Sequence, residues 1–416
     1  MNRRMFGLGA FVAMIALVVA AFAPAQENPT LPVPPAPITG GTHKQTGTIS
    51  VQGTKDKSHV LRSFCVTPDG TILAAVGPHV SYGAAAATKS SGGELQILAA
   101  EGKLIRSTPV PFSPQAVGVA PNGTIFLAGE GQIARFDKAG ALQITSEAPY
   151  LTEIMRDTSK LRTQAEEQLK SQRETYTNIV KQQKEQLKKL SAKDPEMLTR
   201  AEKSQLKVME SNIKAYESMA AMFEKKSPDD VVKEIKASIV DFRAAAVSEK
   251  DLFLVSRQVR GYGFSVWRMT HDLKEPKQIV SDLAGCCGQM DIQCRNGEVF
   301  VAENSRKRVN QYSRDGEQLA SWGKAGRGGD DGTFGGCCNP MNLCCSIGSD
   351  VFAAESDGLI KHYSSEGKFI GLVGVAKVQP GCKSSIIAAT PDGQKFFYFD
   401  ANKLNIIVLT KEESKK

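Results

Sequence analysis

The chain has 416 residues, too many for one ordinary small domain. Its charged residues at 23% and hydrophobic residues at 41% are typical of a globular protein that can build a real core. The formal net charge of +8 is spread along the chain. No zinc-finger spacing and no RNA-binding aromatic motif accompanies this charge, so we expect no nucleic-acid partner.

The first 25 residues have the order of a signal peptide. Arg3 and Arg4 form a positive region, residues 5–22 form an apolar run, and Ala-Pro-Ala at 23–25 is a small-residue cleavage site. We therefore expect a mature chain that begins near Gln26, is exported to the periplasm or the outside of the cell, and keeps no stable membrane span. The alternative is an uncleaved anchor, because the run approaches the ~18 residues that can span a bilayer.

Residues 26–44 are rich in proline and predict an extended linker. A first β region follows over residues 45–148. It opens with an alternating strand at 46–52 that has no hairpin partner nearby, and then shows two groups of short strands, at about 60–108 and 115–145. Pro-Asp-Gly and Pro-Asn-Gly turns punctuate the two groups.

Residues 149–238 break the strand pattern. From Tyr150 to Lys226 there is no glycine, and apolar residues recur at steps of three and four, first over 151–190 and then over 198–223. Pro195 lies in the break between the two seams. The spacing predicts an antiparallel coiled-coil hairpin whose first helix has about 40 residues, or roughly 60 Å at 1.5 Å per residue. Dense charge around narrow seams favours a projecting arm over a helical domain packed on the sheets, and a shorter helix then leads back to the strands.

Residues 239–411 return to strands, and 412–416 form a charged tail. After a third group that begins near Phe242, two similar segments follow, with Glu303 and Glu355 at the same place 52 positions apart. Four short strands per unit at a period near 40–50 residues predict the blades of a β-propeller. The last group has only three strands, and the strand at 46–52 can supply the fourth and so join the chain ends. The expected fold is an all-β, six-bladed propeller with an inserted helical hairpin; five or seven blades are the alternatives.

Two of these units resemble a known repeat. The phrase VFVAENSRKRVNQYSRDGEQLASWG resembles the NHL repeat through Glu303, Asn304, Arg308, Val309 and Tyr312, and GGCCNPMN resembles the Gly-Cys-Cys-Asn-Pro opening of secreted bacterial propellers of that group. The other blades match loosely, and the helical insertion lies outside the resemblance. The resemblance implies a propeller of NHL type, in a family that includes scaffolds, ligand binders and a few enzymes.

The nine cysteines are the most unusual feature of the chain, and eight of them lie in the last three units. The pairs Cys286-Cys287 and Cys337-Cys338 fall where a blade is entered. We expect structural roles for the remaining positions, which are Cys65, Cys294, Cys344, Cys345 and Cys382.

Three interpretations of the cysteines stay open. Adjacent cysteines can close on each other, or each can bridge to a neighbouring blade, and either would be a structural staple. A strained, exposed pair could instead exchange thiols or trap a soft metal. Buried free thiols are the third alternative. Zinc-ligand and haem-attachment spacings are absent, so no metal site is assigned and no cofactor is expected, with a divalent metal as the minor alternative.

Propeller topology predicts where function would lie. Connections between blades and connections between a blade's second and third strands emerge on one face, so the helical insertion, the cysteine pairs, the 77–93 loop and the 304–307 loop should gather around the channel mouth. The candidate binding residues are Cys286, Cys287, Cys337, Cys338, Asn339, Asn304, Glu303 and Glu355. The two glutamates have an alternative role, the stabilisation of their own turns.

The predicted function is that of an exported binding or scaffold protein. It engages a protein or a small ligand at the loop-rich face, with the helical arm as an interaction element that can also form homo-oligomers. No catalytic residue is identified. The alternative is an envelope enzyme of lyase, hydrolase or thiol-redox type that acts at the channel mouth.

Overall fold

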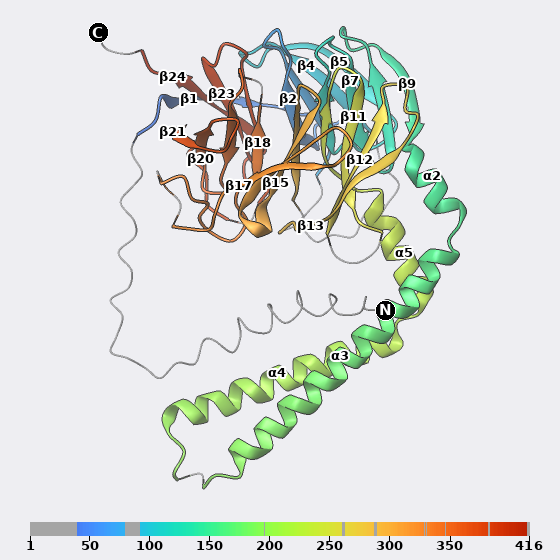
Figure 1. The fold of residues 1–416 in the computed structure, drawn as a ribbon, viewed down its shortest axis with the longest axis vertical. Helices are drawn as coiled ribbons and strands as arrows, with labels where there is room; N and C mark the ends of the chain where they lie inside the picture. The colour runs from blue at the N-terminus through green and yellow to red at the C-terminus, as the bar shows by residue number, and fades with distance from the viewer. Residues whose placement is uncertain are drawn as a thin grey trace. The chain divides into compact units, whose positions relative to one another are not determined.

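The structure is a computed structural model that describes residues 40–413 except 80–91, 195, 260–262, 287, 288, 328, 330, 346 and 382. The predicted signal peptide and most of the proline-rich linker lie outside the described residues. Within them, the strands form six sheets of four strands each, and four α-helices lie in the chain between the second and third sheets (Figure 1). The predicted count of six blades is confirmed.

The first three sheets are each built from four consecutive strands that pair antiparallel with their neighbours. Their strands are β2 (His59–Val66), β3 (Ile72–Pro78), β4 (Gly93–Leu98) and β5 (Leu104–Val110); β6 (Ala116–Val119), β7 (Ile125–Gly129), β8 (Gln132–Phe136) and β9 (Leu142–Glu147); and β10 (Phe242–Val247), β11 (Asp251–Arg257), β12 (Phe264–Thr270) and β13 (Lys277–Leu283).

The last three sheets contain the two similar units and the chain ends. Their strands are β14 (Asp291–Arg295), β15 (Glu298–Glu303), β16 (Arg308–Tyr312) and β17 (Gln318–Trp322); β18 (Asn342–Cys344), β19 (Val351–Ala354), β20 (Leu359–Tyr363) and β21 (Phe369–Val375); and β22 (Ile387–Ala389), β23 (Lys395–Asp400), β24 (Asn405–Lys411) and β1 (His43–Ser50). A short 3-10 helix, η1 (Asn304–Arg306), joins β15 to β16.

The innermost strands of the six sheets follow one another around a centre. Strands β2, β6, β10, β14, β18 and β22 contact each other in this order, and β22 contacts β2 again. The six sheets nevertheless stay separate and do not merge into one continuous sheet. The predicted Pro-x-Gly turns follow three of these inner strands, and their glycines adopt positive φ values of 84° at Gly70, 87° at Gly123 and 66° at Gly393.

The N-terminal strand pairs with the last strand of the chain, as predicted. β1 is antiparallel to β24, with Ser50 opposite Asn405 and His43 opposite Lys411. The strand ends at Ser50 and begins three residues before the predicted Thr46, inside the segment that we expected to be linker. The side chains of Ile49 and Val51 are buried in the core that the last sheet shares with the first, so both ends of the chain contribute to one blade.

The insertion contains four helices, α2 (Pro149–Arg156), α3 (Ser159–Ser191), α4 (Arg200–Lys225) and α5 (Pro228–Ile239). The prediction of one helix of about 40 residues is wrong, because the helix is interrupted at Asp157. The Asp157 carboxylate accepts hydrogen bonds from the backbone N–H and the hydroxyl of Ser159, which replaces the helical pattern locally. No helix among the described residues is long and apolar enough to span a membrane.

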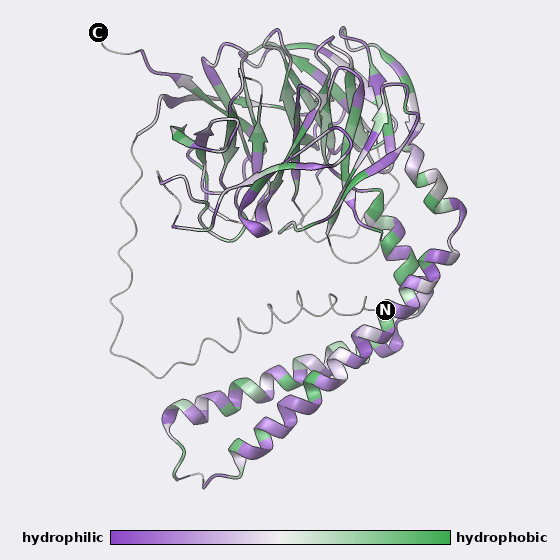
Figure 2. Cartoon of the chain, viewed as in Figure 1, coloured by the Kyte–Doolittle hydropathy of each residue, from purple (hydrophilic) through white to green (hydrophobic). Residues whose placement is uncertain are grey.

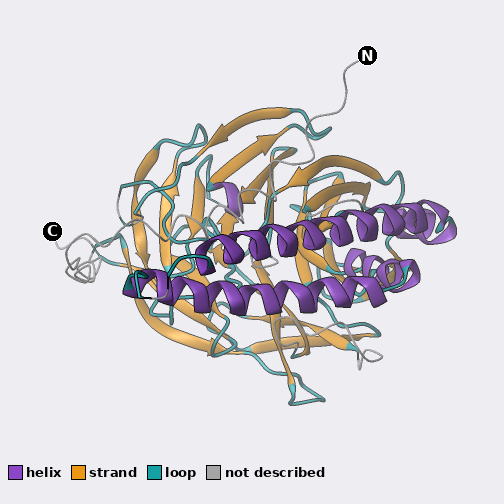
Figure 3. Cartoon of the chain, turned by 90° about the horizontal axis from the view of Figure 1, so that it is seen from below, coloured by secondary structure: helices purple, strands orange, loops and turns teal. Residues whose placement is uncertain are grey.

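Helices α3 and α4 lie side by side, joined by a short loop (Figure 3). Met209 and Ile213 are buried, and hydrophilic residues alternate with hydrophobic ones along the pair (Figure 2). Near the C-terminus of α4, Phe223 stacks on Tyr176 of α3, with the ring centroids 5.2 Å apart. Thr199 and Glu202 form a reciprocal capping box at the start of α4, which fixes where that helix begins.

The base of the insertion belongs to the core of the second and third blades. Leu161, Ala165 and Leu169 of α3 are buried in one cluster with Phe126 of β7 and Phe242 of β10. Tyr150 of α2 stacks on Trp267 of β12, with the ring centroids 4.2 Å apart and the rings nearly parallel. The expectation of an arm that leaves the sheets without sharing their core is therefore wrong for its base. The apolar seam of α3 continues past the hairpin because its base packs against α5, whose Val231, Ile235 and Ile239 are buried in the same cluster.

Candidate functional site at the channel mouth

The six innermost strands surround a cavity of about 2330 Å³. Its lining includes residues from every inner strand, together with Asp230, Lys233 and Ser238 of α5. The last helix of the insertion therefore borders one mouth of the cavity. Gln289, three residues after Cys286, lines the same cavity.

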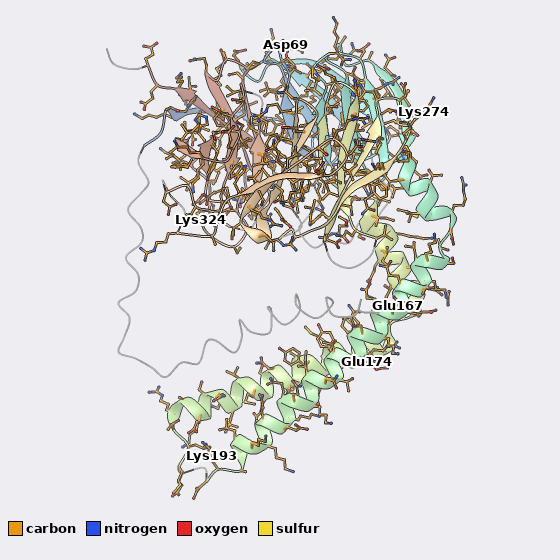
Figure 4. The ribbon with its side chains drawn as sticks, in the orientation of Figure 1. Asp69, Glu167, Glu174, Lys193, Lys274 and Lys324 are labelled. Atoms are coloured by element: carbon orange, nitrogen blue, oxygen red, sulfur yellow. The ribbon has the colours of Figure 1, made fainter. Side chains whose placement is uncertain are left out.

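The long connections gather on one face, as propeller topology predicts. The ammonium of Lys307, after η1, donates a 2.5 Å hydrogen bond to the carbonyl of Gly336, beside Cys337. In Figure 4, Lys324 in the connection from β17 to β18 lies on the side of the sheets where α5 enters, and Asp69 in a short turn lies on the opposite side. The middle of the predicted 77–93 loop, residues 80–91, lies outside the described residues.

Two arginines from different blades meet inside this mouth. Arg62 comes from β2 and Arg243 from β10, and both line the cavity. Asp241 pairs with Arg243, and the other oxygen of its carboxylate accepts a 2.7 Å hydrogen bond from the amide of Gln115. Burial lowers the pKa of Arg62, the charge of Asp241 opposes this shift, and Arg243 adds to it. Asp241 thus pairs with Arg243 and acts on Arg62 only through its charge.

The arginine pair has unused hydrogen-bond donors. The Nε atoms of Arg62 and Arg243 are both buried, and neither has a hydrogen-bond partner among the described residues. An arginine remains protonated at any physiological pH, so the two groups offer directed donors and an uncompensated positive charge. This arrangement suits a carboxylate or phosphate group. The sequence prediction missed these residues, although an arginine inside the inner strands HVLRSFCV and FRAAAV was a signal.

Hydrogen bonds of one recurring kind join neighbouring inner strands in the cavity wall. A side-chain oxygen near the start of one inner strand accepts the backbone N–H of the next blade. Gln115 accepts from Phe242 at 3.0 Å, Asp291 from Leu343 at 2.8 Å, and Asn342 from Ile387 at 2.8 Å. Burial raises the pKa of Asp291 to about 7. The cavity wall therefore contains a carboxyl group that titrates near neutral pH.

Four predicted site residues hold the loops that carry the cysteines. Glu303, Asn304, Glu355 and Asn339 are all buried and do not line the cavity. Glu303 accepts from the backbone N–H of Ala284 at 2.9 Å, and Glu355 accepts from that of Gly335 at 3.1 Å. This arrangement supports the alternative that the glutamates stabilise turns, and ligand binding by these four residues stays a prediction.

The structure brings together three of the four predicted cysteines. The Sγ atoms of Cys338 and Cys286, from connections into neighbouring blades, lie 3.1 Å apart, and those of Cys337 and Cys338 lie 3.0 Å apart. Cys338 is buried, Cys286 is half-buried and Cys337 is exposed. Cys287 lies outside the described residues. The sulfur atoms approach one another both within a pair and between adjacent blades, so the three interpretations of the cysteines stay open.

The other cysteines lie deeper in the sheets. Burial raises the pKa of Cys65 and Cys294 to about 12 and that of Cys345 well above its ordinary value, with Cys344 acting in the same direction on Cys345. Such thiols stay protonated near neutral pH and are poor nucleophiles. Structural roles for these cysteines stay a prediction. Cys382, the fifth predicted structural cysteine, lies outside the described residues.

The fold and its central cavity define a six-bladed β-propeller. No family model matches the chain, and no curated protein matches it. Solved structures with similar folds include the WD40 domain of Neurospora crassa Pan2 (8% identity, 91% of this chain and 98% of that chain covered, TM-score 0.43). Another is the calcium-binding protein regucalcin from Agrobacterium tumefaciens (11% identity, 90% and 98% covered, TM-score 0.43).

A protein described as a putative gluconolactonase is similar in the same way, at 10% identity with 89% of this chain and 94% of that chain covered and a TM-score of 0.43. None of these similarities assigns an activity, a ligand or a partner to this chain.

Proposed function

We propose that this protein is an exported binding protein of the NHL propeller type, which takes the carboxylate or phosphate group of a ligand at the channel mouth. The observation that carries the proposal is the pair formed by Arg62 and Arg243, which line the cavity with buried Nε donors that have no partner among the described residues. A bound anion would accept from both groups and would compensate the charge that Asp241 leaves unpaired.

Export rests on the order of charged, apolar and small residues over positions 1–25. The NHL type rests on Glu303, Asn304 and Arg308, and Glu303 recurs 52 residues later as Glu355. N-terminal sequencing of the protein recovered from the periplasm or the medium tests export; an intact Met1 on protein that is found only in the cytoplasm would overturn it.

The hairpin of α3 and α4 serves as the second contact element, in the manner of an antiparallel coiled coil. Its outer surface carries large apolar side chains that a monomer leaves in water, namely Met222 with 54% of its surface exposed and Val208 and Met219 with 42% each. A protein partner or a second copy of this chain would cover them. Light scattering on the full chain, with Met219 and Met222 both changed to glutamine as the comparison, shows whether the copies associate through α4.

Titration calorimetry at low salt tests the arginine site, with inorganic phosphate and citrate as the probes. We expect saturable one-to-one binding of at least one probe to the full chain. Because a charge-assisted hydrogen bond contributes about 1.5–3 kcal/mol, R62Q and R243Q should each weaken binding by roughly 10-fold to 100-fold. The matched control is R106Q, which removes an exposed arginine from the outer strand β5 and should change nothing.

Absence of binding to both probes would overturn the proposal. So would equal affinity in the wild-type chain and in both cavity variants. Circular dichroism melts of the same samples show whether each variant keeps its sheets.

A further inference from the structure

The three cysteines at the channel face form a set of sulfur donors that the proposed binding function does not use. The sulfur atoms of Cys286, Cys337 and Cys338 all lie within 4.8 Å of one another. They come from two connections, β13 to β14 and β17 to β18, that enter neighbouring blades. Bringing ligands from two connections to one point is how protein metal sites are commonly built.

The backbone on both sides of the cluster is held by buried side chains. Asn304, fully buried, accepts the N–H of Cys286 at 2.7 Å and donates to the carbonyl of Gln289 at 3.2 Å. Asn339, also buried, donates to the carbonyl of Gly335 at 2.9 Å and accepts from Ser356 at 2.8 Å. The two asparagines therefore fix the loops that carry the sulfur atoms before any ion arrives.

Positive charge lies beside the cluster. Lys307 donates from its ammonium to the carbonyl of Gly336, the residue before Cys337. Within the described part of the chain, no histidine or carboxylate belongs to the cluster, so its donors are sulfur alone.

We propose that Cys286, Cys337 and Cys338 bind one Cu(I) ion through three thiolate sulfurs. Thiolate ligands select soft ions such as Cu(I), whereas calcium and magnesium need oxygen ligands. Zinc in structural sites takes four ligands, and the residues that the structure describes supply three here. With a metal–sulfur distance near 2.3 Å, three sulfurs around one ion would lie about 4 Å apart. Cys338 lies 3.0 Å from Cys337 and 3.1 Å from Cys286, so these sulfurs would move apart by about 1 Å when the ion binds. Binding releases the thiol protons to solvent.

The experiment uses the full chain, reduced and handled without oxygen, and titrates it with Cu(I) against the chromophoric chelator bicinchoninate. We expect one tightly held Cu(I) per chain. Replacing one of three thiolates should weaken binding at least 100-fold, so C286S and C338S should release the ion to the chelator. C65S is the matched control, because it removes a cysteine from the first blade, and it should bind as the wild-type chain does.

X-ray absorption of the loaded wild-type chain gives a second readout that does not depend on any variant folding. A sulfur-only, three-coordinate shell supports the site, and a shell of nitrogen or oxygen overturns it. Failure of the reduced chain to retain Cu(I) against the chelator, retention by C286S equal to wild type, or a Cys286–Cys338 disulfide in the protein as isolated would each overturn it as well. These outcomes are independent of phosphate or citrate binding at Arg62 and Arg243.

Discussion

Glu303 and Glu355 occupy the same place in two consecutive blades, and both are fully buried, yet they meet different cations. Glu303 pairs with Arg306 at 2.8 Å and with Arg308, two side chains that reach solvent. Glu355 pairs with Lys361, which is itself fully buried. Burial raises the pKa of Glu355, and the charge of Lys361 opposes that rise. The fifth blade thus encloses an ion pair that the fourth blade leaves partly open.

We therefore expect Lys361→Met to be strongly destabilising. It leaves the Glu355 carboxylate without its cation in a closed core, which typically costs about 3–5 kcal/mol of the free energy of unfolding. Urea unfolding of the variant measures the loss. The double variant E355Q/K361M should recover part of it, because the glutamine oxygen can still accept from Gly335.

Arg306→Met is the matched control for this loss. Half of the Arg306 side chain is exposed, so its removal should cost no more than about 1 kcal/mol. A Lys361→Met variant as stable as this control would contradict the interpretation of a closed ion pair.

Asp291→Asn should change how stability depends on pH. The folded-state pKa of Asp291 is about 7, above its ordinary value of 3.8, so the unfolded chain loses this proton first as the pH rises. Its contribution to stability is complete below pH 3.8 and is lost as the pH rises through 7, at up to about 1.4 kcal/mol per pH unit between these values. The asparagine variant should lose this slope. Its free energy of unfolding relative to that of the wild-type chain should therefore be higher at pH 7.5 than at pH 5, and urea unfolding of both chains at the two pH values measures this difference.

The next blade supplies the reciprocal test for this prediction. Asn342 has the equivalent hydrogen bond to the backbone of the following blade, so Asn342→Asp should create the pH dependence that Asp291→Asn removes. Identical pH profiles for the wild-type chain and both variants would show that Asp291 keeps an ordinary pKa.

The helical insertion should tolerate change at its tip but not at its base. Leu161→Ala and Leu169→Ala remove side chains that are buried in the cluster that α3 and α5 share with the second and third blades, and each should cost about 2–5 kcal/mol. Replacing residues 182–214 with a short glycine-serine linker removes only the distal part of the hairpin and should leave the melting transition of the sheets within a few degrees of wild type. Thermal melts followed by the β signal in circular dichroism compare the two kinds of change. Equal losses for tip and base would show that the hairpin stabilises the blades along its whole length.

The pairing of β1 with β24 gives a prediction about the N-terminus. A chain that starts at Gly53 loses this strand, leaves β24 as an open edge and removes the buried Ile49 and Val51, each worth roughly 1.5–3 kcal/mol. We expect a lower melting temperature and concentration-dependent association relative to a chain that starts at Gly40. Equal melting temperatures and sedimentation of the two chains would rule out a stabilising role for β1.

The sequence by itself determined the features that depend on neighbours along the chain. The Pro-x-Gly turns, the alternating strands and the 52-residue spacing of Glu303 and Glu355 are local signals, and together they were enough to predict six blades. The unpaired strand near Thr46 and the three-stranded last group were enough to predict that the chain ends meet. The helical periodicity from Leu151 onward showed the insertion, though not the break at Asp157, where one side chain competes with the helix for a backbone N–H.

Tertiary structure alone decided which distant residues meet. Arg62 and Arg243 are 181 positions apart, and they meet because the inner strands of different blades converge on one cavity. Cys286 reaches Cys338 because adjacent blades place equivalent connections side by side. The apolar seam of α3 faces α4 along the hairpin and α5 at its base, and the periodicity of the sequence does not say which helix lies opposite each residue. A sequence pattern states which side of an element is apolar, but only the packed fold states what covers it.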